Sequence, residues 1–220
     1  MMQILLADDH ELLLQGVRAV LEAEPDWLVC GTARDGCEAV ELAARFLPDV
    51  AVLDLAMPRL NGLEAARQIR RESPSTRVLV LTGSHSDELW CDAWAAGASG
   101  YVLKGDGVAA LIAGVRAVAE GRPFFGARPL HDLGGGGAPA GPGGLRRLRG
   151  QSPHSPSLTP REREIAQLLA EGKTNWCVAS ILGISIKTVE THRAHIMQKL
   201  GCESFAELVR YAVRNLMVAP

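Results

Sequence analysis

Reactive polar side chains follow short apolar runs at four points in the first half of the chain. Each run has the length of a buried strand, and the polar residues stand at its carboxyl end. They are Asp8 and Asp9, then Asp54, Thr82 and Lys104. Singly, each has an ordinary explanation as a helix cap, a surface acid, a strand former or a solvated charge. Only their combination points to a site.

Three carboxylates in one place repel one another, and at least one pKa rises unless a cation joins them. Mg²⁺ fits such a place, because it takes one or two carboxylates and completes its octahedron with water and phosphate oxygens. A bridging metal also neutralises charge during phosphoryl transfer. The Thr82 hydroxyl can donate to a phosphoryl oxygen, and the Lys104 ammonium can pair with the same group. We therefore predict that Asp54 accepts a phosphoryl group, with Mg²⁺ as cofactor.

Alternating strand-like and helix-like stretches occupy residues 3 to about 122 and would position these side chains. Strands are expected at Gln3–Ala7, Trp27–Thr32, Val50–Leu53, Arg77–Leu81 and Ser99–Leu103, with helices near 11–23, 36–46, 60–72, 87–96 and 107–120. This alternation predicts an α/β fold, a five-stranded doubly wound parallel sheet with helices on both faces. Ligands of such sheets bind at the carboxyl ends of the strands, where the polar residues stand.

Residues 127–157 are dominated by Gly and Pro and cannot build a core. We expect a flexible linker with stiffer proline segments there. Its arginines, Arg146, Arg147 and Arg149, are either solvated linker charge or auxiliary contacts to DNA phosphates. The expected division is a first domain at 1–126, this linker, and a second domain at 158–220.

The second domain shows only helical patterns. Thr159 is expected to cap a helix that starts with Pro160, and Glu162 to close a capping box. Further helices are predicted from about 174 to 182, from 186 to 200, and from a second capping box at Ser204–Glu207 to about 215. The single glycine turn between the second and third helices predicts a helix-turn-helix in a four-helix domain.

The helix predicted at 186–200 has two distinct faces. An apolar face is expected to be core and consists of Ile186, Val189, Ile196 and Leu200. The opposite stripe consists of Lys187, Glu190, Thr191, Ala194 and Gln198. Because the apolar face must pack inward, the stripe is the part that a DNA major groove can meet.

The distribution of charge indicates two domains with different functions. Residues 1–126 hold 11 Lys and Arg against 18 Asp and Glu, a balance of −7, whereas residues 158–220 hold 8 against 6, a balance of +2. An acidic first domain joined to a weakly basic second one fits a nucleic-acid contact in the second domain. The five cysteines have no C-x-x-C spacing, the amino terminus has no signal-peptide pattern, and no apolar run is long enough for a membrane span. We expect a cytoplasmic protein without a membrane partner.

These motifs together resemble a two-component response regulator of the NarL/FixJ class. The receiver resemblance covers residues 3–122 through Asp8-Asp9, Asp54 with Met57-Pro58 and Gly62, Thr82, and Tyr101 with Lys104. The carboxyl-terminal part is similar to the LuxR-type helix-turn-helix through Leu158–Glu164, Ala179, Ile184-Ser185, Thr188-Val189, His192 and Lys199–Gly201.

The receiver resemblance implies roles for single residues. A sensor histidine kinase would phosphorylate Asp54, and the phosphoryl group would gate dimerisation and promoter binding. Magnesium would be held by Asp9, Asp54 and the main-chain carbonyl of Ala56, with Asp8 acting through a water. Thr82 would turn toward the phosphoryl group, and Tyr101 would swing inward behind it. Self-dephosphorylation would be at most slow, and the small Gly83 hints at a shorter-lived phosphoryl group, because it leaves room for water.

The LuxR resemblance places base-reading residues on the predicted stripe of the 186–200 helix. They are Glu190, Thr191 and Ala194. Glu190 can accept from a cytosine amino group, and Thr191 can touch a thymine methyl. Phosphate contacts are expected from Lys187, Thr188, Arg193 and Lys199. The DNA partner would be a double-stranded promoter with paired half-sites, bound by a homodimer.

Two other function classes are open to an acidic pocket of this kind. A phosphatase with an aspartyl-phosphate intermediate usually carries a second acid two residues after the nucleophile, but this chain has Ala56 there and lacks that proton carrier. An interaction module with a vestigial pocket would be expected to have lost some of the pocket residues, and all are present. We therefore expect a phosphorylated transcription regulator rather than an enzyme.

Overall fold

The computed structural model describes residues 1–83, 87–125, 158–215 and 217–218, and for residues 87–91 it describes the backbone alone. The predicted linker at 127–157, with Arg146, Arg147 and Arg149, lies outside the described residues. Within the described ranges, each helix is too short or too polar to cross a membrane.

A parallel sheet forms the centre of the first domain, with the strand order β2-β1-β3-β4-β5-β6. The strands are β1 Met2–Ala7, β2 Trp27–Ala33, β3 Val50–Asp54, β4 Arg77–Thr82, β5 Gly100–Leu103 and β6 Phe124–Phe125. The doubly wound parallel sheet is confirmed, with one strand more than the five that we predicted. The added β6 is only two residues long and pairs with Gly100 and Tyr101. Such a short edge strand has no alternating pattern for a sequence to reveal.

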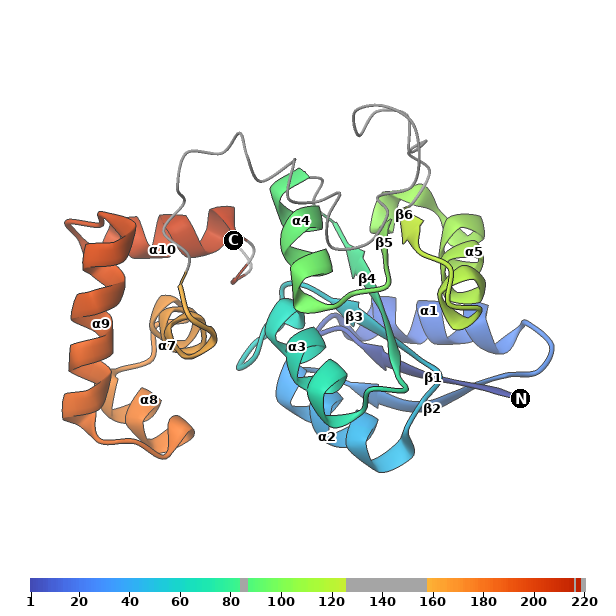
Figure 1. Cartoon of the computed structure of the whole chain (residues 1–220), viewed down its shortest axis with the longest axis horizontal. Helices are drawn as coiled ribbons and strands as arrows, with labels where there is room; N and C mark the ends of the chain where they lie inside the picture. The colour runs from blue at the N-terminus through green and yellow to red at the C-terminus, as the bar shows by residue number, and fades with distance from the viewer. Residues whose placement is uncertain (84–86, 126–157, 216, 219–220) are drawn as a thin grey trace.

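Helices cover both faces of this sheet (Figure 1). They are α1 Glu11–Glu22, α2 Gly36–Phe46, α3 Gly62–Glu72, α4 Asp87–Ala96 and α5 Val108–Ala119, with a short 3-10 turn, η1, at Lys104–Asp106. Alternate residues of β4 show how the faces separate. Val78 and Val80 belong to the core under α2, α3 and α4, whereas Leu79 and Leu81 belong to the core under α1 and α5. This alternation is what a strand buried on both faces requires.

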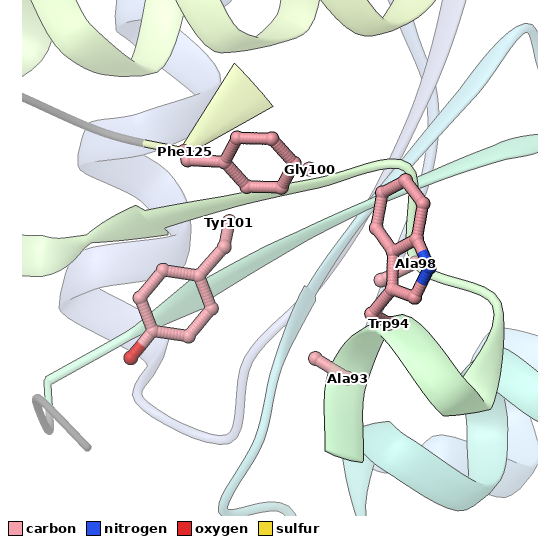
Figure 2. Close-up of a pocket in the computed structure, with 6 residues that line it drawn as sticks. All are labelled: Ala93, Trp94, Ala98, Gly100, Tyr101 and Phe125. Atoms are coloured by element: carbon pink, nitrogen blue, oxygen red, sulfur yellow. The ribbon is translucent and has the colours of Figure 1, made fainter. Parts of the chain in front are cut away.

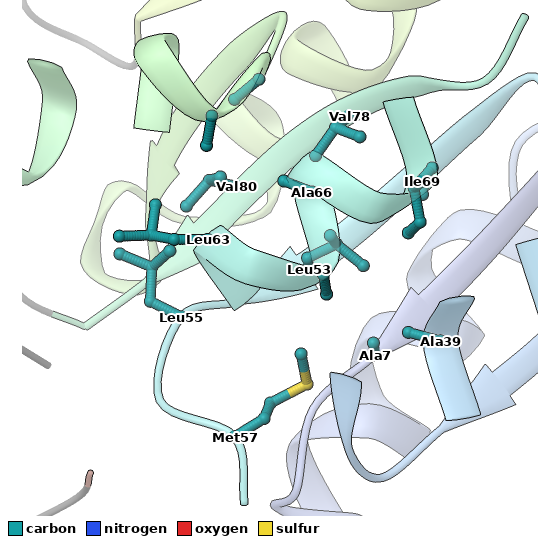
Figure 3. Packing of buried hydrophobic residues seen from close by; sticks show 14 of the residues in the cluster. Ala7, Ala39, Leu53, Leu55, Met57, Leu63, Ala66, Ile69, Val78 and Val80 are labelled. Atoms are coloured by element: carbon teal, nitrogen blue, oxygen red, sulfur yellow. The ribbon is translucent and has the colours of Figure 1, made fainter. Parts of the chain in front are cut away.

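The loop that follows β3 is part of the first core. Leu55 and Met57 are buried together with Leu53 at the end of β3 and Leu63 in the first turn of α3. Figure 3 shows the Met57 side chain on the same side of the sheet as Ala7 and Ala39. Apolar burial on both sides of Ala56 therefore anchors the loop directly after the phosphoacceptor candidate.

The second domain contains four helices among its described residues: α7 Pro160–Ala170, α8 Asn175–Leu182, α9 Ile186–Leu200 and α10 Phe205–Arg214. Their starts follow the predicted caps. Thr159 accepts from the Glu162 N–H and completes a capping box, and Ser185 accepts from the Thr188 N–H. Gly183 ends α8 in the left-handed region, at φ 63°, which lets α9 leave at a sharp angle. The helix-turn-helix is confirmed.

Two details of the second domain differ from the sequence prediction. Ile186 is 43% exposed, although we expected it in the core with Val189 and Ile196, which are fully buried. It is the first residue of α9, directly after the turn from α8, so the apolar period of the helix did not predict its exposure. At Ser204 the side chain accepts from the Glu207 N–H as expected, but the Glu207 carboxylate accepts from Glu203 N. The second capping box is therefore half formed.

Candidate functional site

Strand register brings the predicted pocket residues to one edge of the sheet. β1 and β3 pair through Ala7 and Leu53, directly before Asp8 and Asp54 in the sequence. Asp54 in turn pairs with Leu81. The next pair of strands places Thr82 opposite Leu103, the residue before Lys104. The carboxyl ends of four adjacent strands thus supply every side chain that we predicted for the pocket.

Lys104 bridges two buried carboxylates. Its Nζ lies 2.7 Å from Asp8 Oδ2 and 3.2 Å from Asp54 Oδ1. Asp8, Asp54 and Thr82 are all buried, at 5%, 4% and 1% exposure. One ammonium thus faces two carboxylates from which most water is excluded, which leaves the group with excess negative charge.

The pKa values of Asp54 and Lys104 reflect this excess of negative charge. Burial raises the pKa of Asp54; Lys104 counteracts the rise, and the neighbouring Asp8 adds to it, with a net upward shift. Burial by itself lowers the pKa of Lys104, but the contact with Asp8 and the charge of Asp54 raise it above its usual value. The lysine is therefore held firmly charged, while Asp54 is incompletely compensated.

The pocket fits a divalent cation. Oxygen atoms of Asp8, Asp9 and Asp54 and a ring nitrogen of His10 all lie within 4.8 Å of one another. Asp8 Oδ2 is buried, and the one cation described beside it, Lys104, is shared with Asp54. Carboxylate oxygens with unsatisfied charge are the ligands that a hard cation prefers.

His10 is the member of this cluster that we did not predict. Its Nδ1 lies 2.9 Å from Asp9 Oδ1 and 3.1 Å from Asp8 Oδ1. Its position directly after the two acids was the available signal. The side chain is 63% exposed, so it lies at the rim of the pocket and orients the two carboxylates from outside.

The loop from Leu55 to Asn61, which contains Ala56, approaches the phosphoacceptor closely. A Cβ atom on Gly62 would lie 1.9 Å from the main-chain oxygen of Asp54, and a Cβ atom on Gly36 would lie 2.1 Å from that of Leu60. Neither distance is possible for a side chain, so glycine is required at both points. The loop therefore packs against the backbone of Asp54 at one end and against the start of α2 at the other.

The predicted switch residue Tyr101 lies on the neighbouring part of the sheet. It is buried, at 8% exposure, and shares a narrow apolar crevice with Ala93, Trp94, Ala98, Gly100 and Phe125 (Figure 2). The rings of Trp94 and Phe125 are 5.9 Å apart and tilted by 52°. The residue that the resemblance assigned to a switch thus lines a crevice beside the ring pair that joins α4 and β6.

The predicted DNA stripe lies on the outer side of α9. Lys187, Glu190, Thr191, Ala194 and Gln198 are all exposed. The Thr191 hydroxyl donates to the main-chain oxygen of Lys187 at 2.9 Å, which leaves its methyl group as the part available for an apolar contact. Exposure of the whole stripe agrees with the predicted surface.

The four predicted phosphate-contacting residues differ in what they already contact. The Thr188 hydroxyl lies 2.8 Å from the Ser185 hydroxyl at the start of α9, and the Arg193 guanidinium lies 5.4 Å from the centre of the Phe205 ring. Lys199 Nζ lies 2.8 and 2.7 Å from the two carboxylate oxygens of Glu162. Lys187 is the exposed basic residue of the stripe. A phosphate would therefore compete with Glu162 for Lys199, but it meets no such competitor in the contacts described for Lys187.

Two family models match separate parts of the chain. The model of the response regulator receiver domain matches residues 4–116, and the model of bacterial regulatory proteins of the luxR family matches residues 156–212. Together they include the acidic pocket and the helix-turn-helix.

Similar proteins match along almost the whole chain. The transcriptional regulatory protein LiaR of Bacillus subtilis is 40% identical over 222 residues, which are 99% of this chain and 100% of LiaR. A structure of the RcsB response regulator of Salmonella typhimurium, described by its conformational dynamism for DNA interaction, is 27% identical, with a TM-score of 0.64 over 97% of this chain and 98% of RcsB. A structure of two RcsB dimers bound to two parallel DNAs is 27% identical, with a TM-score of 0.54 over 96% of each chain.

Proposed function

Because this chain belongs to the two-component response regulators that join a receiver domain to a LuxR-type DNA-binding domain, we propose that phosphorylation of Asp54 controls its binding to promoters. It is a DNA-binding transcriptional regulator, and its family consists of regulators rather than enzymes in general. The receiver implies a histidine kinase as partner, and the LuxR-type domain implies DNA. The finer assignments below are ours.

Asp54 is the phosphoryl acceptor, and a sensor histidine kinase is the donor. The observation that carries this assignment is the bridge from Lys104 to both Asp8 and Asp54, since it leaves two buried carboxylates to share one cation. A bound Mg²⁺ would neutralise the phosphoryl oxygens during transfer. Lys104 pairs with the transferred group, and the Thr82 hydroxyl at the end of β4 donates to it.

Mg²⁺ is assigned to Asp9, Asp54 and the main-chain carbonyl of Ala56, with Asp8 acting through a water. Receiver domains bind Mg²⁺ at an acidic pocket, and the oxygen atoms gathered here suit that ion. Slow self-dephosphorylation is the only turnover that we assign. It is supported by Gly83 beside Thr82, where a Cβ atom would meet nothing within 4 Å, so water can approach.

On phosphorylation, Thr82 turns toward the phosphoryl group and Tyr101 follows it. This movement would change the apolar crevice that Tyr101 shares with Trp94 and Phe125, and with it the surface formed by α4 and β5. We propose that this change favours a homodimer, the arrangement in which RcsB is described on DNA.

The DNA interface is α9. Glu190, Thr191 and Ala194 meet base edges, and Lys187, Thr188, Arg193 and Lys199 meet phosphates. The support is that the first three and Lys187 share one exposed helix face. Residues 1–126 form the receiver, 127–157 the linker and 158–220 the DNA-binding domain of a cytoplasmic protein.

Gated binding can be measured with the intact chain. Random double-stranded DNA is first selected with protein kept phosphorylated by acetyl phosphate and Mg²⁺. Binding of the selected DNA is then compared with and without acetyl phosphate, for the wild type and Asp54→Asn. We expect at least about tenfold tighter binding of paired half-sites by the phosphorylated wild type, because two linked contacts act together. An equal response of Asp54→Asn would contradict gating through this residue.

A further inference from the structure

The DNA-binding domain contacts the phosphorylation loop through one buried side chain. Gln167, in α7, is 0% exposed. Its Nε2 donates to the main-chain oxygen of Met57 at 2.7 Å, and its Oε1 accepts from the Asn61 N–H at 2.9 Å. Both polar ends of one carboxamide are therefore satisfied by two backbone groups of the other domain, at the two ends of a short loop segment.

Glu171, one helical turn after Gln167, adds a second contact to the same loop. Its Oε1 accepts from the Arg59 N–H at 3.1 Å and from Gln167 Nε2 at 3.0 Å. Arg59 has φ 65°, a conformation that is unfavourable for a non-glycine residue and persists only where the surroundings hold it. From the receiver side, Arg59 Nη1 is held by Asp35 Oδ2 at 2.9 Å. The loop is thus fixed from both domains.

Movement at Asn61 cannot remain local. Gly62 follows it and packs directly on the main-chain oxygen of Asp54, too closely for any Cβ atom. The Gly62 N–H also donates to the Leu55 main-chain oxygen at 2.9 Å, which closes the loop around Ala56. A shift of Asn61 would therefore displace the loop that includes Ala56 and the backbone that carries Asp54.

From these contacts we propose that Gln167 is a positioning residue for the phosphorylation site. Its carboxamide preorganises the loop after β3, so the DNA-binding domain increases the affinity of the receiver for Mg²⁺. This inference rests on the proposed magnesium site at Asp9, Asp54 and Ala56. By thermodynamic reciprocity, Mg²⁺ must strengthen the contact of α7 with the loop by the same factor.

The geometry favours this positioning role over masking of the DNA surface. The contact uses α7, whereas the DNA stripe of α9 is exposed along its length. Figure 1 places α7 between the receiver and α9. With α7 in this position, the stripe remains open to solvent, so what the contact changes is the loop beside Asp54.

The test measures Mg²⁺ binding to the intact protein by isothermal titration calorimetry, without any phosphodonor. Gln167→Ala is compared with Gln3→Ala. This control removes the same type of side chain at an exposed position near the amino end of β1, away from the pocket at the carboxyl end. We expect about fivefold weaker Mg²⁺ binding in Gln167→Ala, equivalent to the net value of roughly one hydrogen bond, and no change in Gln3→Ala. Glu171→Ala, at a half-exposed position that does not endanger folding, is expected to weaken binding by about twofold.

Amide exchange reports on the contact itself. The Asn61 N–H, followed by NMR, should exchange faster in Gln167→Ala than in the wild type, and Mg²⁺ should slow it in the wild type. Saturating Mg²⁺ should restore the initial rate of phosphorylation of Gln167→Ala by acetyl phosphate to the wild-type rate, which it would not do for a protein damaged elsewhere.

Each other outcome has its own meaning. Faster Asn61 exchange with unchanged Mg²⁺ affinity in both Gln167→Ala and Glu171→Ala would overturn the inference, and so would unchanged Asn61 exchange in Gln167→Ala. A wild-type protein that binds no Mg²⁺ at all would instead remove the proposed metal site, and with it the premise of this inference.

Discussion

Each domain contains a lysine paired with buried carboxylate, and the two pairs have opposite electrostatics. In the receiver, Lys104 faces both Asp8 and Asp54, and burial leaves the pKa of Asp54 raised. In the DNA-binding domain, the one carboxylate described as pairing with Lys199 is that of Glu162. Burial would raise the pKa of Glu162, but Lys199 and the Thr159 N–H lower it to about 2.

Helix capping explains the difference. Glu162 closes the capping box of α7, where Thr159 N donates to its Oε2 at 2.8 Å, so the carboxylate is satisfied by both a cation and a backbone donor. The carboxylates at the sheet edge have one lysine between two of them. A fully compensated pair stabilises a fold, whereas an undercompensated group retains affinity for further positive charge. The pair of Lys199 and Glu162 is thus structural. The group of Lys104, Asp8 and Asp54 is suited to binding a metal and accepting a phosphoryl group.

Removal of each lysine should separate the two roles most strongly. Lys104→Ala is expected to slow phosphorylation by acetyl phosphate by about a hundredfold, because one preorganised cation is lost from the transferring group. At saturating Mg²⁺, Lys199→Ala should leave that rate unchanged and destabilise only the DNA-binding domain. Both rates can be followed by intact-mass analysis over time. Similar rates for the two variants would remove the distinction between the pairs.

Neutralising the carboxylates should have opposite effects on stability. Glu162→Gln is expected to lower the free energy of unfolding by about 1–2 kcal/mol, a value kept small because Lys199 is partly exposed and screened. Asp54→Asn should instead raise the free energy of unfolding, because the repulsion between the carboxylates of Asp54 and Asp8 disappears. Urea denaturation at neutral pH, without Mg²⁺, measures both. A loss of stability in Asp54→Asn as large as that in Glu162→Gln would break the comparison.

The two sites should also differ in their pH dependence. Glu162 has a lowered pKa in the folded state, so its contribution is present above 4.5 and is lost as pH falls toward about 2. Asp54 has a raised pKa, so the folded state binds its proton more tightly and stability falls as pH rises through that pKa. The check is the thermal unfolding temperature of each variant and the wild type, measured between pH 2 and 7. In Glu162→Gln, the part of the decrease at acid pH that comes from Glu162 should be absent. Asp54→Asn should be more stable than the wild type at the upper end of this pH range.

The smallest effects are expected on the exposed stripe of α9, which depends on neither pair. Thr191→Ala should cost about 1 kcal/mol at one base position and relax preference there. Lys187→Ala should weaken binding to all sequences and reduce the salt slope by about one. Fluorescence anisotropy on selected DNA and single-base variants, at several salt concentrations, distinguishes them. If both variants lost affinity uniformly, Thr191 would not read a base.

The receiver pocket could be predicted from the sequence because the sheet topology determines where most of its residues lie. Once alternating strands and helices predict a parallel sheet, the carboxyl ends of β1, β3, β4 and β5 must meet, and Asp8, Asp54, Thr82 and Lys104 stand at those ends. The caps at Thr159 and Ser185 were equally readable, because each depends on residues only three positions apart.

What escaped prediction depends on residues far apart in sequence or on the ends of elements. Gln167 meets Met57 across 110 positions, and no periodicity connects α7 with that loop. The ion pair between Lys199 and Glu162 spans 37 positions and appears only when α7 and α9 pack. Ile186 matched the apolar period of its helix, yet it is the first residue of α9 and is 43% exposed. The apolar periodicity of a helix identifies which of its faces packs, but not how far along the helix the packing extends.

The central claim is that Asp54 accepts a phosphoryl group with the help of Mg²⁺ and Lys104. Its most direct test is intact-mass analysis of the full-length protein after incubation with acetyl phosphate, with and without Mg²⁺, for the wild type and Asp54→Asn. The account predicts one added phosphoryl group in the wild type with Mg²⁺, and none in Asp54→Asn or after chelation. The same uptake by Asp54→Asn would contradict it.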